Sequence, residues 1–89
     1  MLQSKSLCGV TLQYNIEGDG YPVILMHGWG GNHTTVQSIE RLLSPHFKVY
    51  NLDFPGFGGS STPPSIWGVE EYTQMLEAFI KDENIEAPI

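Results

Sequence analysis

Apolar and polar residues alternate along residues 9–17. The apolar residues occupy every second position: Val10, Leu12, Tyr14 and Ile16. A period of two is typical of a strand with one buried face, as in antiparallel sheets. The next apolar segment, residues 23–26, reads Val-Ile-Leu-Met without alternation. Such a run is typical of a strand that helices cover on both faces, so we expect an antiparallel strand, a turn at residues 18–20 and a buried strand that starts after Pro22.

Two later segments have helical spacing. In the first, Thr34 with Gln37 fits a capping box, and Ser44-Pro45 would end the helix. Its apolar residues are Val36, Ile39, Leu42 and Leu43. In the second, a helix is expected to open at Val69 and to stop at Asn84. Its predicted apolar face comprises Val69, Tyr72, Leu76, Phe79 and Ile80, and its predicted solvated positions are Glu70, Glu71, Lys81, Asp82 and Glu83.

A strand over residues 47–53 is expected between the two helices, and residues 87–89 resemble the start of another strand. Alternating strands and helices build a mostly parallel sheet with helices on both faces, so the predicted fold class is α/β. The single domain, residues 1–89, is expected to be incomplete because a strand begins where the sequence stops.

Charge excludes some functions. The formal net charge is −6, with only four lysines and arginines, so no basic stripe could neutralise nucleic-acid phosphates or an anionic membrane surface. No apolar run approaches the ~20 residues that span a bilayer. The one cysteine, Cys8, allows no internal disulfide. We therefore expect a soluble cytoplasmic protein without nucleic-acid or membrane partners; its oligomeric state is open.

The candidate chemistry lies in two glycine-rich loops. His27-Gly28-Trp29-Gly30-Gly31 directly follows the apolar strand and precedes a helix. Ligands of open α/β sheets bind at this edge, and glycines leave backbone N–H groups unscreened. The loop therefore suits a negative charge, either a phosphate or a transient oxyanion. The second loop, Asp53-Phe-Pro-Gly-Phe-Gly-Gly-Ser60, follows the next strand.

These two motifs, in this order and strand context, resemble the α/β-hydrolase family over residues 9–89. The resemblance implies the first part of a hydrolase sheet (β-β-α-β-α, mostly parallel, incomplete). It implies a serine hydrolase acting on an ester, thioester or related carbonyl bond, without a cofactor. The Trp29 backbone N–H would be one oxyanion-hole donor, and the Trp29 side chain would line the pocket of a small-molecule substrate. Gly28, Gly30 and Gly31 would shape the loop, with Gly28 and Gly30 beside the substrate. The second donor follows the nucleophile.

The nucleophile itself is missing. Gly-x-Ser-x-Gly occurs nowhere in the sequence, and the family places it after the strand expected near Ile89. The acid and histidine of a triad are missing as well, so the segment alone is predicted to be inactive. Related enzymes use Asp in place of Ser, as dehalogenases and epoxide hydrolases do, so the type of nucleophile is open.

Nearby polar residues have structural interpretations. The resemblance implies that His27 bonds within the loops, and Asp53 is expected to hold the following turn through backbone N–H groups. Histidines 27, 33 and 46 lack the spacing of a metal site. Ser60 and Ser61 are not nucleophile candidates, because no strand-to-helix elbow holds them. Phe57 and Trp67 are expected to contribute to packing.

Two alternatives stay open. Gly28-x-Gly30 followed by Asp53 resembles a dinucleotide-binding fingerprint, but position 33, where a third glycine would fall, is a histidine. Alternatively, the chain is a non-catalytic, truncated or interaction-only protein. Residues 23–26 would then form an apolar sheet edge, so the isolated chain is predicted to fold poorly or to self-associate.

Overall fold

The computed structural model of the chain describes residues 2–27, 31–63, 65–86 and 88. Its elements are β1 (Leu2–Leu7), β2 (Val10–Glu17), β3 (Tyr21–Met26), the short 3-10 helix η1 (His33–Val36), α1 (Gln37–Leu43), β4 (Phe47–Leu52) and α2 (Val69–Asp82). The strands form one sheet in the order β1-β2-β4-β3. β2 pairs antiparallel with β1 and β4, and β3 pairs parallel with β4. The α/β class is confirmed, but the expected mostly parallel arrangement is wrong for the described strands: the sheet is mixed, because two of its three strand pairs are antiparallel.

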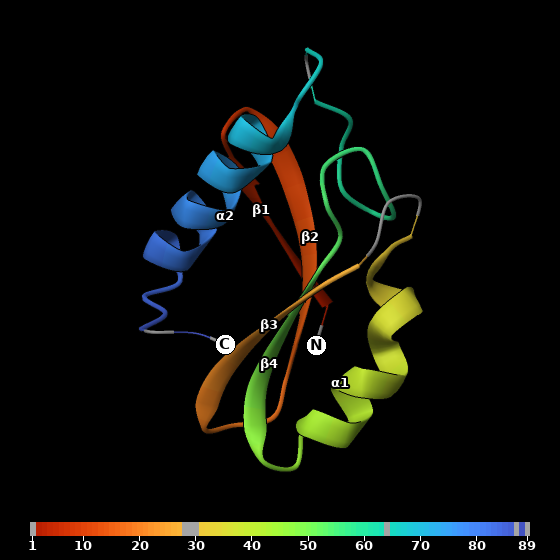
Figure 1. Ribbon diagram of the computed structural model, residues 1–89, viewed down its shortest axis with the longest axis vertical. Helices are drawn as coiled ribbons and strands as arrows, with labels where there is room; N and C mark the ends of the chain where they lie inside the picture. The colour runs from red at the N-terminus through yellow and green to blue at the C-terminus, as the bar shows by residue number, and fades with distance from the viewer. Residues whose placement is uncertain (1, 28–30, 64, 87, 89) are drawn as a thin grey trace.

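The two helices cover opposite faces of this sheet (Figure 1). The face toward α2 is apolar and holds the main core. Its buried members are Leu12, Tyr14, Tyr50, Leu52, Met75, Phe79 and Ile85. The alternation of β2 places Leu12 and Tyr14 here, as predicted. On α2 the predicted face is confirmed for Phe79, which is buried, and for Leu76 and Ile80, which pack against the core. Val69 is wrong, because it is 85% exposed, and the buried Met75 was missed.

The face toward α1 combines the buried valines Val23 and Val49 with amide side chains, and this changes part of the expectation for that helix. Strand register places Asn15 opposite Asn51 on this face. The helix presents Glu40 to them, 4% exposed, and Glu40 accepts a hydrogen bond from Asn15 Nδ2 at 3.0 Å. Ile39 and Leu42 are 46% and 75% exposed instead of buried. A sheet face that carries amides attracts a carboxylate rather than an aliphatic stripe, because buried amide groups need hydrogen-bond partners.

Both helix starts use hydrogen bonds between neighbouring residues. The Asn32 side chain accepts from Thr34 N–H at 2.9 Å, and Asn32 N–H donates to Thr35 Oγ1 at 3.1 Å. The capping box therefore begins at Asn32, two residues before the predicted Thr34, and η1 precedes α1. α2 begins at Val69 as predicted, with Gly68 N–H donating to Glu71 Oε1 at 2.6 Å. Glu71 is thus a capping residue rather than merely solvated.

Strand β1 was not predicted. Its sequence, Leu-Gln-Ser-Lys-Ser-Leu, has no apolar alternation, and most of it is exposed. It pairs with β2 through a two-residue hairpin at Cys8-Gly9, where both residues have positive φ (50° and 79°). Positive φ at both central positions is typical of a type I′ turn, whose twist suits a hairpin.

Lys5 joins β1 to the end of α2. Its ammonium group binds the carboxylates of Asp82 and Glu83, which were expected to be only solvated. Burial lowers the pKa of Lys5, but the hydrogen bonds to Asp82 and Glu83 outweigh burial and raise it well above its usual range. Burial and the nearby Glu83 charge also raise the pKa of Tyr14. The helix ends with Asn84 at φ 54°, as its predicted role as a stop requires. The strand expected over residues 87–89 has two of its three residues outside the described part.

Candidate functional site

The residues that directly follow β3 and β4 lie next to one another at the carboxyl edge of the sheet. His27, directly after β3, is 5% exposed, and its Nε2 accepts a hydrogen bond from Phe54 N–H at 3.0 Å. Its ring also lies against the rings of Phe54 and Phe57, with centroids 4.9 and 5.5 Å away. The structural role expected for His27 is confirmed: it links the end of β3 to the loop after β4. Phe57 contributes to packing here, as predicted.

Asp53 is fully buried directly after β4, and its carboxylate accepts three hydrogen bonds. Oδ2 accepts from Gly59 N–H at 3.0 Å, which confirms that Asp53 holds the following turn. Oδ1 accepts from His33 N–H at 2.5 Å and lies 2.8 Å from His33 Nδ1. The contact with His33 was missed, since nothing in the sequence links positions 33 and 53 except the spacing of the dinucleotide fingerprint.

The same contacts weaken the dinucleotide alternative. In that fingerprint the acid binds a ribose hydroxyl. Here both oxygens of Asp53 are engaged within the chain by Gly59 and His33. His33 occupies the place of the third glycine and packs its ring against the acid. The arrangement is that of an internal clamp.

Asn51, the last but one residue of β4, adds a second contact to His33. Its Nδ2 donates to the His33 carbonyl oxygen at 2.8 Å. Asn51 is fully buried, and its Oδ1 has no partner in the described part of the chain. His33 is therefore held through its N–H, its ring and its carbonyl group by two residues of one strand end.

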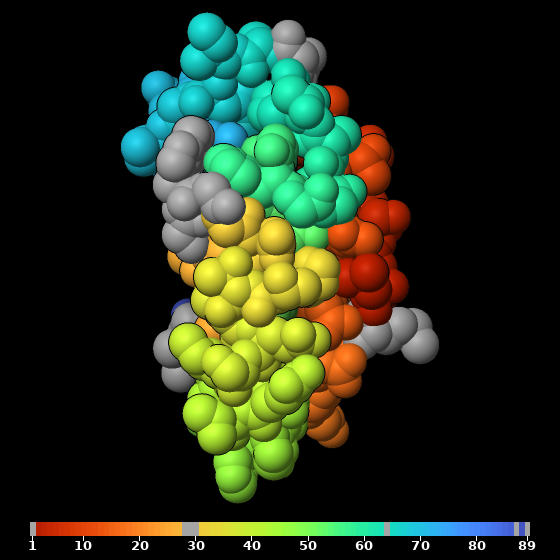
Figure 2. Space-filling view, turned by 90° about the vertical axis from the view of Figure 1, so that its right-hand side faces the viewer, coloured from red at the N-terminus to blue at the C-terminus, as the bar shows by residue number. Residues whose placement is uncertain are grey.

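Ser60 and Ser61 serve the loop that follows Asp53. Ser60 Oγ donates to the Asp53 carbonyl oxygen at 2.6 Å and accepts from Gln13 N–H at 2.7 Å. Ser61 Oγ accepts from Thr11 N–H at 2.8 Å. Both hydroxyl groups bind the backbone of β2 and hold the loop against it. Their geometry agrees with the prediction that neither is a nucleophile. Figure 2 shows this loop, in green, directly above η1 and α1.

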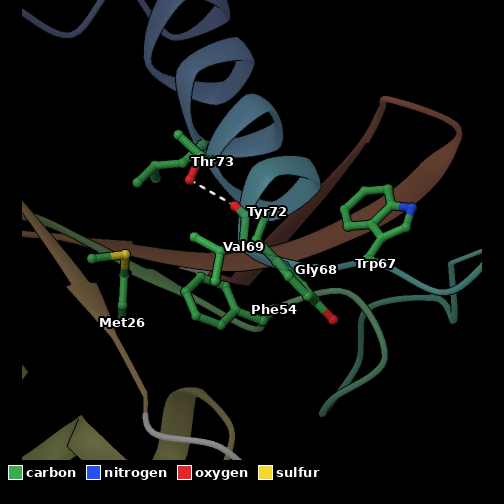
Figure 3. A pocket seen from close by; sticks show the side chains of 8 residues that line it. Met26, Phe54, Trp67, Gly68, Val69, Tyr72 and Thr73 are labelled. Atoms are coloured by element: carbon green, nitrogen blue, oxygen red, sulfur yellow. Dashed lines mark hydrogen bonds between the residues drawn. The ribbon is translucent and has the colours of Figure 1, made fainter.

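An apolar pocket of about 480 Å³ opens between β3 and α2. Its lining residues, most of them labelled in Figure 3, are Met26, Phe54, Trp67, Gly68, Val69, Tyr72, Thr73 and Leu76. The two hydroxyl groups in the lining are already engaged: Tyr72 donates to the Pro55 carbonyl oxygen at 2.9 Å, and Thr73 donates to that of Val69 at 2.7 Å. Trp67, expected to pack, is half-buried at the pocket rim and has edge contact with Tyr72. The pocket therefore offers hydrocarbon surface.

The predicted site residues Gly28, Trp29 and Gly30 lie outside the described residues. Their neighbours on either side, His27 and the stretch from Gly31, are described, and they place the two ends of the loop at the carboxyl edge of the sheet. Within the described ranges, no three side chains of the metal-binding types come together. In the same ranges, no helix is both long and apolar enough to cross a membrane.

Comparison with known proteins places these features in a family. Residues 21–87 match the alpha/beta hydrolase fold family. A pimeloyl-[acyl-carrier protein] methyl ester esterase of Vibrio cholerae is 36% identical over 67 residues, which are 75% of this chain and 26% of that enzyme. The corresponding esterase of Pectobacterium carotovorum is 45% identical over 51 residues, 56% of this chain and 20% of that enzyme. The chain thus spans about a quarter of the length of the curated relatives it matches.

Solved structures agree on the fold. The haloalkane dehalogenase DatA of Agrobacterium tumefaciens superposes with a TM-score of 0.90 at 20% identity, covering 99% of this chain and 30% of that one. The epoxide hydrolase CorEH superposes with a TM-score of 0.88 at 22% identity, covering 93% and 29%. At these identities the likeness concerns the fold. With the family match over residues 21–87, it shows that this chain belongs to the alpha/beta hydrolase family.

Proposed function

We propose that this chain is the N-terminal segment of a serine hydrolase that cleaves an ester, thioester or related carbonyl bond. The observation that carries the proposal is that His27, which opens the glycine-rich loop, is held at the carboxyl edge of a parallel strand pair in a member of this family. The relatives named as methyl ester esterases support an ester as the substrate. The protein would act in the cytoplasm on a small molecule.

In this proposal the Trp29 backbone N–H is one donor to the developing oxyanion. A carbonyl oxygen becomes negatively charged only as the tetrahedral intermediate forms, so a donor aimed at it stabilises the transition state more than the substrate. Gly28 and Gly30 would shape the loop, and the Trp29 side chain would line the substrate site. The nucleophile, its histidine and the acid would lie beyond residue 89.

The sheet itself indicates where the rest of the domain would attach. The crossover β3–α1–β4 steps along the sheet toward β2, with α1 on one face. α2 lies on the opposite face (Figure 1). A right-handed crossover from β4 through α2 must therefore step the other way, beyond β3. The next parallel strand would pair with the outer edge of β3, and its following helix would cover the apolar pocket between β3 and α2.

The experiment is an activity assay on the complete protein with p-nitrophenyl esters, together with labelling by a fluorophosphonate, which modifies activated serines. We expect ester hydrolysis and one labelled serine beyond residue 89. A Trp29→Pro variant, which lacks the backbone N–H, should lose roughly 100- to 1,000-fold in kcat with little change in KM. Absence of both hydrolysis and labelling would contradict the proposal.

A second candidate reaction follows from the solved structures, which include a haloalkane dehalogenase and an epoxide hydrolase. These reactions use an Asp nucleophile, which a fluorophosphonate does not label. Halide release or epoxide opening by an unlabelled complete protein would favour this candidate. The segment 1–89 alone should be inactive in every one of these assays.

A further inference from the structure

The stretch between His27 and His33 is tied at both ends to one short segment, residues 51–54. At its start, His27 Nε2 accepts from Phe54 N–H at 3.0 Å. At its end, His33 is bound by Asp53 and by Asn51. We propose that Asn51, Asp53 and His33 form a clamp that positions the oxyanion loop, with His33 as its specific positioning residue. This inference rests on the proposed function.

His33 is suited to this role because the clamp binds its backbone N–H, its backbone carbonyl group and its ring. Its N–H donates to Asp53 Oδ1, its carbonyl group accepts from Asn51, and its ring Nδ1 lies 2.8 Å from the same Asp53 oxygen. A residue bound through donor, acceptor and side chain cannot rotate about its own backbone without breaking a buried hydrogen bond. Both partners are fully buried, where water cannot replace a broken hydrogen bond.

The loop needs such an external support. Of the five residues between His27 and His33, three are glycines, at positions 28, 30 and 31. Glycine has the largest conformational freedom of all residues, so this stretch does not specify its own backbone path. The contacts of His27 and His33 fix the two positions that this stretch must connect. A misplacement of about 1 Å in a catalytic group can cost on the order of 100-fold in rate.

The clamp is separate from the chemistry, and this gives the proposal a distinctive signature. None of the three residues would touch substrate; they would act through the backbone of the loop. Because the oxyanion exists only in the transition state and its intermediates, loosening the loop should lower kcat and leave KM nearly unchanged. Loss of fold would lower the amount of active protein without altering the kcat of the folded fraction.

The test compares His33→Ala with His33→Asn in the complete protein. The Ala variant removes the donor at the Nδ1 position, whereas an asparagine amide can place an N–H close to it. His46→Ala, at an exposed position before β4, is the matched control. We expect kcat for a p-nitrophenyl ester to fall about 10-fold in His33→Ala at constant KM. His33→Asn should recover to within about threefold of wild type, and His46→Ala should equal wild type. Equal losses in the Ala and Asn variants, or a change in KM alone, would overturn the proposal.

A second measurement keeps the clamp testable apart from catalysis. Backbone amide chemical shifts, measured by NMR, should change at Trp29, Gly31 and Gly59 in Asp53→Asn, because the new amide group faces donors where an acceptor stood. In His33→Ala they should change at Trp29 and Gly31 and stay as in wild type at Gly59. If the complete wild-type protein hydrolyses no ester but the variants show these changes, the proposed function fails and the clamp stands. Unchanged shifts at Trp29 and Gly31 in both variants would refute the clamp.

Discussion

At the scale of single residues, buried polar side chains at the carboxyl ends of β3 and β4 serve the backbone. Asp53 accepts two backbone N–H groups, His27 accepts one, and Asn51 donates to a carbonyl group. A buried carboxylate is tolerated when hydrogen-bond donors surround it. Where these donors are backbone N–H groups of different segments, the carboxylate holds those segments together. The strand ends thus organise both glycine-rich loops through a few short side chains.

Asp53→Ala should destabilise the complete protein by about 3 kcal/mol or more, because it leaves the N–H groups of His33 and Gly59 without their buried acceptor. Urea unfolding followed by circular dichroism measures this free energy. Asp19→Ala is the control, since Asp19 lies in an exposed turn and accepts a hydrogen bond from its neighbour Gly20. Equal destabilisation by the two variants would contradict the clamp geometry.

At the scale of elements, contacts between segments distant in sequence fix how strands and helices meet. The turn after β2 passes so close to the chain between α1 and β4 that Gly18 has no room for a side chain: a Cβ there would collide with the carbonyl oxygens of Ser44 and Phe47. At the other side of the sheet, Lys5 of β1 holds the end of α2. These contacts join each outer element to the central strands.

Gly18→Ala should cost clearly more than Gly9→Ala. Both glycines have similar positive φ, 83° and 79°, so an alanine at either position pays about 1–2 kcal/mol for its left-handed backbone. Gly9 has nothing within 4 Å of a built Cβ, whereas Gly18 meets two carbonyl oxygens. We expect an additional loss of about 2 kcal/mol or more at Gly18, measured by thermal or urea unfolding. Similar losses in both variants would show that the turn is looser than in this structure.

The Lys5 cluster should give an alkaline limit to stability. The pKa of Lys5 is raised from 10.5 and that of Tyr14 from 10.0, so folding favours the protonated form of both groups. Their contribution is complete below these ordinary values and is lost as pH rises through the higher folded-state values. Lys5→Met should therefore lower the free energy of unfolding by about 1 kcal/mol at pH 7. Above pH 10 the free energy of unfolding should fall less steeply in this variant than in wild type. Parallel pH profiles of the two proteins would disprove this coupling.

At the scale of the whole molecule, the two sheet edges differ. The β1 edge has Ser and Lys side chains and pairs with the rest through a tight hairpin. The β3 edge is apolar, with Tyr21 and Met26 about half exposed, and the pocket beside it is apolar too. Ile39 and Leu42 of α1 add further exposed hydrocarbon surface. An open strand of this kind pairs readily with another chain.

The segment 1–89 alone should therefore self-associate at micromolar concentration through β3. Met26→Lys, which places a charge at the pocket beside this edge, should shift it toward the monomer in size-exclusion chromatography with light scattering. Leu2→Lys is the matched control, since Leu2 is 49% exposed on the opposite edge strand. A wild-type segment that stays monomeric, or an equal effect of both lysines, would contradict the assignment of the edge.

The family resemblance and most elements could be predicted from the sequence. The alternation of β2 and the spacing in α2 correctly indicated which side chains of each element are buried, because such periodicity reflects the contacts of one element with its neighbours. The apolar run of β3 predicted the strand but not its burial: of its six residues only Val23 is buried. Asp53 and His27 were assigned structural roles, since each follows directly after a strand. The positions of Gly28, Trp29 and Gly30 stay a prediction.

What local patterns could not provide was decided by tertiary structure. β1 forms because β2 offers it backbone partners, although its own sequence has no alternation. α1 turns Glu40 inward because strand register brings Asn15 and Asn51 together beneath it. His33 meets Asp53 only when β3 and β4 lie parallel in the observed register. The sequence alone determined most of the elements, namely β2, β3, β4 and the two α-helices, through periodicity and capping. The sheet determined which faces and side chains meet, because contacts between distant residues depend on register, which no local pattern contains.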